Sequence, residues 1–140
     1  MGPASLRALL ELPLAAIEFA AAGGTNFAKL ELLRSTPEKQ AIFENFARVG
    51  HTAAEMLGWV NQLCTELGDR RRVGNLVLSG GVRDFMDGYF LLRRSTLPAA
   101  YGQASGFLKH ARGEYADLQA YVAAQIRGLE LAYAFLQPRP

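Results

Sequence analysis

Three short glycine-containing segments hold the residues of this sequence that are best suited to bind a phosphate group. They read AAAGGTNF (residues 20–27), SGGVRDF (residues 79–85) and YGQASGF (residues 101–107). Glycines allow a tight turn that brings backbone N–H groups close to a ligand, and successive N–H groups form a concavity that attracts anions. Arg83 adds a planar, permanently charged donor to the second segment. These residue types indicate a phosphate site; the alternative is a set of strand-to-helix turns that bind nothing.

Each of these segments belongs to an apolar run that is short enough to be a buried strand. The predicted strands cover residues 15–24, residues 76–79 and a stretch from residue 98 that passes into a turn at residues 102–105. Strands that alternate with helical segments favour an α/β fold with a parallel sheet. Because the carboxyl ends of parallel strands meet at one edge of a sheet, the three turns are expected to share one site.

Helical periodicity and capping residues predict the remaining elements. The expected helices cover residues 3–12, two stretches within residues 35–68 (the second one opened by a capping box at residues 52–55), a segment capped by Asp84, and a long helix over about 114–136. The start of the helix after Asp84 is expected to add partial positive charge to the phosphate site. The packing stripe predicted for the last helix consists of Tyr115, Leu118, Val122, Ile126, Leu129, Tyr133 and Leu136.

The other residues that could carry chemistry give weaker signals. His51 and His110 lie near predicted helix boundaries and are expected at the surface or in caps, and Trp59 is expected in the core or in an interface. Cys64 lies in a predicted helix without a nearby base, which argues against a nucleophile. No His, Cys, Asp and Glu residues have the spacing of metal ligands, so no metal site is predicted.

Composition and charge exclude several classes of function. The 140 residues form a single-domain length of chain, and half of them are hydrophobic. A net charge of +2 and one arginine run, residues 70–72, do not indicate a nucleic-acid partner. A single cysteine fits the reducing cytoplasm. Glu11, Pro13 and Glu18 interrupt the apolar amino terminus, so no membrane span or signal sequence is expected.

The strand-and-turn segments, taken in order, resemble a known family. AIEFAAAGGTNF, LVLSGGVRDFMDG and YGQASGFLKHA are similar to the carboxyl-terminal half of type 2 isopentenyl-diphosphate delta-isomerase. That family consists of FMN-dependent (β/α)8 TIM barrels. The resemblance covers nearly the whole chain and implies that residues 1–140 form a partial FMN-binding barrel domain, with strands 6–8, their flanking helices and an extended helical insertion at about 35–68.

The resemblance also implies roles for individual residues. Thr25 matches a family threonine or serine that contacts FMN. The turn after the second strand matches the FMN-phosphate turn, and the small pair after the third strand closes over the same phosphate. The matching residues of the two turns are Gly80, Gly81, Val82 and Arg83, and then Ala104 and Ser105. The family interconverts isopentenyl and dimethylallyl diphosphate with reduced FMN, and it also implies Mg²⁺ and NADPH, for which this sequence offers no ligands.

The sequence also departs from the family. The family's amino-terminal half, which carries the catalytic and metal-binding groups, has no counterpart here, so catalytic residues are not assigned and the isolated chain is expected to show little or no isomerase activity. One alternative is a non-catalytic half-barrel that binds a phosphate ligand or self-associates. Another is part of an FMN-dependent oxidoreductase of the alpha-hydroxy-acid type. Unpaired strand edges predict a homo-oligomer.

Overall fold

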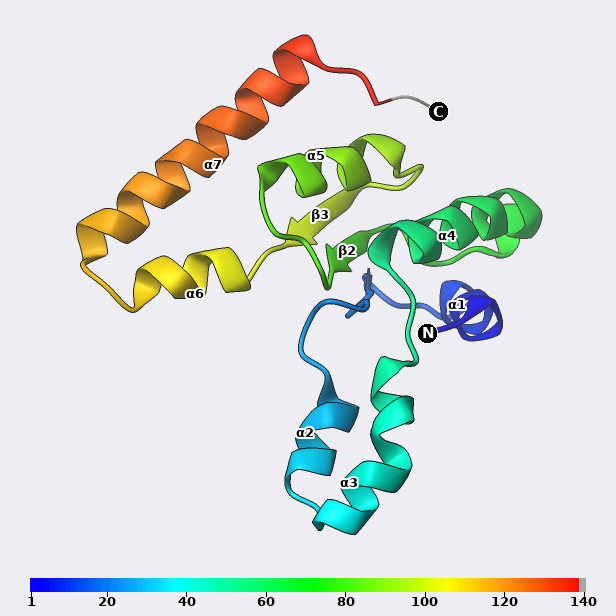
Figure 1. The fold of residues 1–140 in the computed structure, drawn as a ribbon. Helices are drawn as coiled ribbons and strands as arrows, with labels where there is room; N and C mark the ends of the chain where they lie inside the picture. The colour runs from blue at the N-terminus through cyan, green and yellow to red at the C-terminus, as the bar shows by residue number, and fades with distance from the viewer. Residues whose placement is uncertain (139–140) are drawn as a thin grey trace.

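A parallel sheet of three strands forms the centre of the computed structural model, which describes residues 1–138 (Figure 1). The strands are β1 (Ile17–Glu18), β2 (Leu76–Ser79) and β3 (Ala99–Gly102), in the order β1-β2-β3. Ile17 lies opposite Leu76, and Ser79 lies opposite Gly102. The predicted α/β class with parallel strands is therefore confirmed, and all three strands end at the same edge.

Helices precede, connect and follow the strands. Their bounds are α1 (Pro3–Leu10), α2 (Phe27–Leu33), α3 (Pro37–Phe43), the 3₁₀ helix η1 (Glu44–Arg48), α4 (Ala53–Leu67), the 3₁₀ helix η2 (Gly68–Arg70), α5 (Phe85–Arg94), α6 (Ser105–Ala111) and α7 (Tyr115–Phe135). No helix within residues 1–138 has both the length and the apolar character that crossing a membrane requires.

The hydrophobic core lies between one face of the sheet and the helices α1 and α4. On β2, Leu76 and Leu78 are buried, whereas the alternate residues Val77 and Ser79 are half-buried. Alternate residues of a strand point to opposite faces, so the second face of the sheet is incompletely covered. Glu18 of β1 is exposed, as is Ala100, which lies opposite Val77 on β3. Parallel sheets are usually covered on both faces, and this sheet is packed on one only.

The predicted helix starts are confirmed. Thr52 and Glu55 form the expected capping box: the threonine hydroxyl accepts from the Glu55 N–H at 3.2 Å, and the glutamate carboxylate accepts from the Thr52 N–H at 2.8 Å. Thr36 caps α3. Asp84 caps α5 as expected, because its carboxylate accepts from the first-turn N–H groups. These caps fix where α3, α4 and α5 begin.

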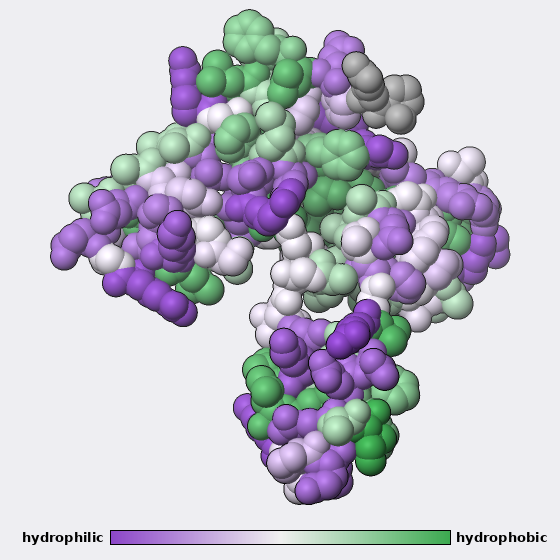
Figure 2. Space-filling view, viewed as in Figure 1, coloured by the Kyte–Doolittle hydropathy of each residue, from purple (hydrophilic) through white to green (hydrophobic). Residues whose placement is uncertain are grey.

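The segment from α2 to η1 projects away from the sheet as a helical arm (Figure 1). None of its residues is buried. In the space-filling view the arm carries apolar and polar surface side by side (Figure 2). Its most exposed apolar side chains are Phe27, Leu33, Ile42 and Phe46.

Two helices were not expected, and two predicted elements are shorter than expected. α2 and α6 lie in segments for which the sequence analysis predicted no helix, and each has only seven residues. Asn26 explains the start of α2, since its side chain accepts from the Lys29 N–H at 2.9 Å. The first strand is limited to two residues, although backbone hydrogen bonds to β2 continue through Ala21. α1 ends at Leu10 instead of residue 12.

The orientation of α7 corrects the predicted packing stripe. The helix packs against α5 and α6. Four residues of the expected stripe are exposed: Tyr115, Ile126, Tyr133 and Leu136. The ring of Tyr133 still meets that of Tyr89 edge-on. The residues that are at least half-buried are Leu118, Tyr121, Val122, Gln125, Gly128, Leu129 and Ala132. The inward face is therefore rotated by about one residue and includes two polar side chains.

Candidate functional site

A cavity of about 610 Å³ opens at the carboxyl edge of the sheet. It receives side chains or backbone from the ends of all three strands and from the loops that follow them. The lining residues are Glu18, Ala20, Gly23, Gly24, Thr25, Phe27, Ser79, Gly80, Gly81, Val82, Gly102, Gln103, Ala104, Ser105 and Leu108. Six of the seven residues that the sequence singled out as a cofactor site line this cavity: Thr25, Gly80, Gly81, Val82, Ala104 and Ser105.

The turn after β2 depends on its two glycines. Gly80 and Gly81 have φ values of +93° and +78°, which only glycine adopts without strain. A Cβ on Gly80 would overlap the backbone of Ala21, and a Cβ on Gly81 would lie 2.8 Å from the Ala22 carbonyl oxygen. The loop after β1 approaches the turn after β2 just as closely, because a Cβ on Gly23 would lie 2.7 Å from the Gly81 Cα. The glycines thus let two loops touch backbone to backbone beside the cavity.

Several backbone donors at this edge have no protein acceptor. Within residues 1–138, the N–H groups of Gly81, Val82 and Ala104 make no hydrogen bond to another protein atom. All three residues line the cavity. Backbone N–H groups seek acceptors, and a cluster of such donors around a concavity suits an anion.

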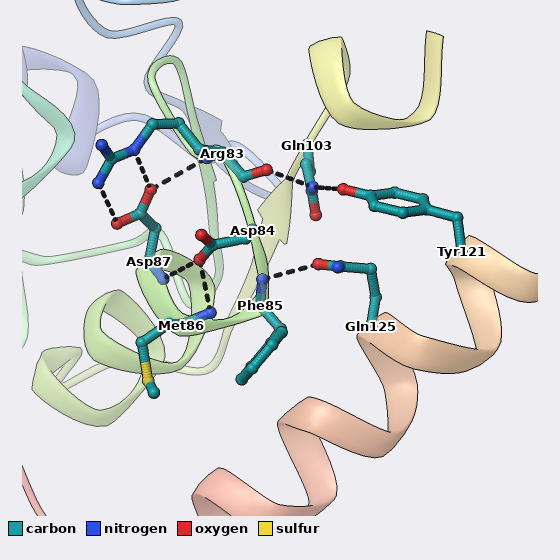
Figure 3. A network of polar contacts seen from close by, with 8 residues as sticks. All are labelled: Arg83, Asp84, Phe85, Met86, Asp87, Gln103, Tyr121 and Gln125. Carbon is teal, nitrogen blue, oxygen red and sulfur yellow. Dashed lines mark hydrogen bonds and ion pairs between the residues drawn. The ribbon is translucent and has the colours of Figure 1, made fainter. Parts of the chain in front are cut away.

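Arg83, the seventh predicted residue, does not line the cavity. Its guanidinium is exposed and forms a forked ion pair with Asp87, with Nε 2.9 Å from Oδ2 and Nη2 3.1 Å from Oδ1 (Figure 3). The Arg83 N–H also donates to Oδ2, at 3.1 Å. Asp87 thus occupies the donors that an anion in the cavity would use, and Arg83 must exchange partners to reach it. Exposed ion pairs contribute little net stability, so the exchange costs little.

The start of α5 does not supply free donors to the cavity, contrary to the sequence-based expectation. The Asp84 carboxylate accepts from the N–H groups of Met86 and Asp87, at 2.9 and 3.2 Å. The Phe85 N–H donates to the Gln125 side chain of α7, at 2.8 Å. Side chains of the protein therefore satisfy the first turn of this helix, and the turn residues before it are the groups that remain for a ligand.

Glu18 is a lining residue that the sequence analysis did not select. Its carboxylate accepts from the Ser79 hydroxyl at 2.9 Å, and the hydroxyl oxygen in turn accepts from the Ala20 N–H at 3.1 Å. The sequence did contain a signal for this residue, because a carboxylate is unusual in a strand whose other residues are apolar. Glu18 places negative charge in the cavity, which an anionic ligand must avoid or offset.

The remaining candidate residues lie away from the cavity lining. His51 meets the ring of Trp59 edge-on, and Trp59 is half-buried against the core. His110 stacks on Tyr121 of α7, with ring centroids 4.3 Å apart. Burial raises the pKa of the Cys64 thiol, which disfavours a reactive thiolate. Among residues 1–138, no three His, Cys, Asp or Glu side chains gather in a way that could hold a metal ion.

The Arg83–Asp87 pair leads to a test by titration. Hydrogen bonds from Arg83 hold the pKa of the Asp87 carboxyl below its ordinary value of 3.8. A lowered pKa in the folded state means that the pair stabilises the fold above pH 3.8 and that this contribution is lost as the pH falls through the lowered pKa. We expect the Asp87 carboxyl carbon to titrate by NMR below 3.8 in the wild type and closer to 3.8 in Arg83→Ala.

Glu66 is the control for this titration. Its pKa is lowered mainly by a hydrogen bond from Arg7, which is separate from Arg83 in sequence and in its contacts, and it should stay lowered in the variant. If the pKa of Asp87 is the same in Arg83→Ala as in the wild type, the two side chains are not paired in solution.

Comparison with known proteins gives two curated relatives. The chain is 35% identical to the isopentenyl-diphosphate delta-isomerase of Xanthobacter autotrophicus over 105 residues, which are 75% of this chain and 28% of that protein. It is 33% identical to the isopentenyl-diphosphate delta-isomerase of Stutzerimonas stutzeri over 128 residues, which are 90% of this chain and 34% of that protein. No family model matches the sequence.

The chain therefore spans about a third of the length of the curated relatives that it matches. The predicted similarity to isopentenyl-diphosphate isomerases is confirmed by these relatives. The type 2 class, the FMN cofactor and the barrel remain predictions.

Proposed function

We propose that this chain is part of an FMN-dependent, type 2 isopentenyl-diphosphate isomerase and that it contributes the site for the FMN phosphate. The observation that carries the proposal is the convergence of three glycine-containing loops, one from each of three consecutive parallel strands, on one cavity. The two relatives support the isomerase part, because both are named isopentenyl-diphosphate delta-isomerase. The whole protein would move a double bond between isopentenyl and dimethylallyl diphosphate.

The uncovered face of the sheet supports the barrel part of the proposal. In a (β/α)8 barrel, one face of each strand packs on helices and the other faces the barrel axis. Here Leu76 and Leu78 face helices, whereas Glu18 and Ser79 face the cavity side. The three strands would then be the last three of a barrel, whose phosphate sites are commonly built from the loops after its final two strands.

The donor chemistry fits a phosphate. The free N–H groups of Gly81, Val82 and Ala104 would bind its oxygens, and the glycines let the backbone approach without interference from a Cβ. Thr25 and Ser105 would add hydroxyl donors from the other two loops. When bound, reduced FMN supplies the proton-transfer chemistry, and the residues of this chain hold its phosphate end. We assign no magnesium or NADPH ligands within this chain.

Flavin binding tests the proposal directly. Riboflavin has the same ring system and side chain as FMN but lacks the phosphate. We expect the purified chain to bind FMN at least about tenfold more tightly than riboflavin, because charge-assisted hydrogen bonds to a phosphate contribute roughly 1.5–3 kcal/mol. Flavin fluorescence measures both affinities. Inorganic phosphate should compete with the binding of FMN but not with the binding of riboflavin. Equal affinities for the two flavins would refute the phosphate site.

Activity is tested separately from binding. With reduced FMN and Mg²⁺, the 140-residue chain is expected to turn over little or no isopentenyl diphosphate, since no proton-transferring residue has been assigned within it. Substantial turnover would show that the chain carries catalytic groups that we have not identified.

A further inference from the structure

The inward face of α7 carries two polar side chains at positions where an amphipathic helix normally places apolar ones. Tyr121 and Gln125 are half-buried and face the turn after β2, whereas Ile126, next to Gln125, is exposed by 57%. Burial of apolar area usually decides which face of a helix turns inward. Exposing an isoleucine while turning a glutamine inward requires specific polar contacts on the inner side.

Those contacts connect α7 to both ends of the segment Arg83–Phe85 (Figure 3). At one end, the Gln125 Oε1 accepts from the Phe85 N–H at 2.8 Å. At the other end, the Gln103 Nε2 donates to the Arg83 carbonyl at 2.6 Å and lies 2.7 Å from the Tyr121 hydroxyl. Gln103 belongs to the loop after β3, so the chain of hydrogen bonds joins the loops after β2 and β3 to one helix.

Two glycines make room for these contacts. A Cβ on Gly106 of α6 would lie 2.8 Å from the Gln103 Nε2 and would also overlap the Tyr121 hydroxyl. A Cβ on Gly128 of α7 would lie 2.6 Å from atoms of the Phe85 ring. A larger residue at either position would require these side chains, or α7 itself, to shift.

The Gln103 amide is held at a cost in stability. Both of its N–H donors are used, but its Oε1 is buried and has no hydrogen-bond partner among residues 1–138. A buried acceptor without a partner destabilises the fold. This arrangement does not maximise stability, but it does fix the position of the Arg83 carbonyl.

We propose that Gln103, Tyr121 and Gln125 are positioning residues that hold the turn Gly80–Asp84 in its ligand-binding shape, so that α7 sets the affinity for phosphate. The inference rests on the phosphate site proposed above. Two consecutive glycines with positive φ give this turn many accessible conformations in the absence of restraint. Holding the N–H groups of Gly81 and Val82 in place before binding lowers the entropy that a ligand must remove.

Conservative substitutions on α7 test this role. Tyr121→Phe removes the hydroxyl and keeps the ring contacts with Phe107 and His110. Gln125→Met removes the acceptor for the Phe85 N–H and keeps a similar length, and Gln125→Glu restores an acceptor. Tyr115→Phe is the matched control, because Tyr115 is on the same helix and is exposed by 72%.

The first readout needs no ligand. In the ¹⁵N-labelled 140-residue chain, Tyr121→Phe and Gln125→Met should shift the amide signals of Gly81, Arg83 and Phe85, whereas Tyr115→Phe should not. Gln125→Glu should return the Phe85 signal towards its wild-type position. The second readout is affinity. The FMN dissociation constant should rise about fivefold for each hydrogen bond removed, and the riboflavin dissociation constant should not change.

The outcomes separate this inference from the phosphate site itself. If the wild type does not prefer FMN to riboflavin, the phosphate site is refuted, and the ligand-free amide signals alone decide whether α7 orders the turn. If the wild type prefers FMN and Tyr121→Phe and Gln125→Met keep that preference, α7 does not position the turn. An equal loss of affinity for both flavins would assign these side chains a general structural role and would also overturn the inference.

Discussion

Gly80→Ala is expected to destabilise the protein by about 3 kcal/mol or more, because it combines backbone strain with overlap of backbone atoms. Gly80 has a φ of +93°, and a Cβ there would lie 2.6 Å from the Ala21 carbonyl carbon and closer still to its nitrogen and oxygen. Ala21 is also hydrogen-bonded to the end of β2, because its N–H donates to the Ser79 carbonyl at 2.9 Å. Relief of the overlap requires β1 and β2 to separate, which opens the core. Urea unfolding followed by far-UV circular dichroism measures the loss.

Two other glycines separate the causes of this loss. Gly68 has a φ of +51° but open space around its Cβ position, so Gly68→Ala should cost only the backbone strain, about 1–3 kcal/mol. Gly58 lies in α4 with open space and no positive φ, so Gly58→Ala should stabilise the helix by about 1 kcal/mol. The expected order of stability is Gly58→Ala, wild type, Gly68→Ala, Gly80→Ala. A Gly80→Ala midpoint equal to that of Gly68→Ala would show that the two loops are not in contact.

Local signals in the sequence were sufficient to predict where β2 ends and that the three turns meet at one cavity. The paired glycines close β2 at Ser79 as predicted, and the turn residues of all three strands meet at one cavity. These features depend on neighbouring residues and on the parallel order of the strands, both of which are readable from a single chain. The Thr52–Glu55 capping box was predictable for the same reason.

Features that depend on distant contacts were not predictable in this way. Apolar residues occur around much of α7, so periodicity could not select its inward face. The structure shows that Gln125 and Gly128 face α5, in contacts with Phe85, which is distant from both in the sequence. The partner of Arg83 was within reach of the sequence, because Asp87 lies only four residues away, in the first turn of the helix that Asp84 was expected to cap. A cationic residue that precedes a helix can be satisfied by a carboxylate in the first turn of that helix before a ligand arrives.

The role of Arg83 can be decided by one substitution series. Arg83→Ala should weaken FMN binding about ten- to a hundredfold, because removal of a charged donor from a phosphate costs roughly 1.5–3 kcal/mol. Arg83→Lys should recover part of the affinity, since a lysine keeps the charge but not the planar fork. Riboflavin affinity should stay constant across the series. Flavin fluorescence titration at fixed salt gives all of these values.

The ion pair with Asp87 makes a second result informative. Asp87→Asn frees the Arg83 guanidinium and removes a negative charge from beside the turn, so it should strengthen FMN binding or leave it unchanged. Arg48→Ala is the charge-matched control, because Arg48 is also exposed and forms an ion pair at the same four-residue spacing, with Glu44 at 3.2 Å on the helical arm.

If Arg83→Ala weakens FMN binding no more than Arg48→Ala does, Arg83 serves only to hold Asp87, and the N–H groups of the turn bind the phosphate without it. If Arg83→Ala alone weakens binding, the guanidinium must leave Asp87 when FMN binds, and the Asp87 pKa should rise towards 3.8 in the complex because its hydrogen-bond donor has moved.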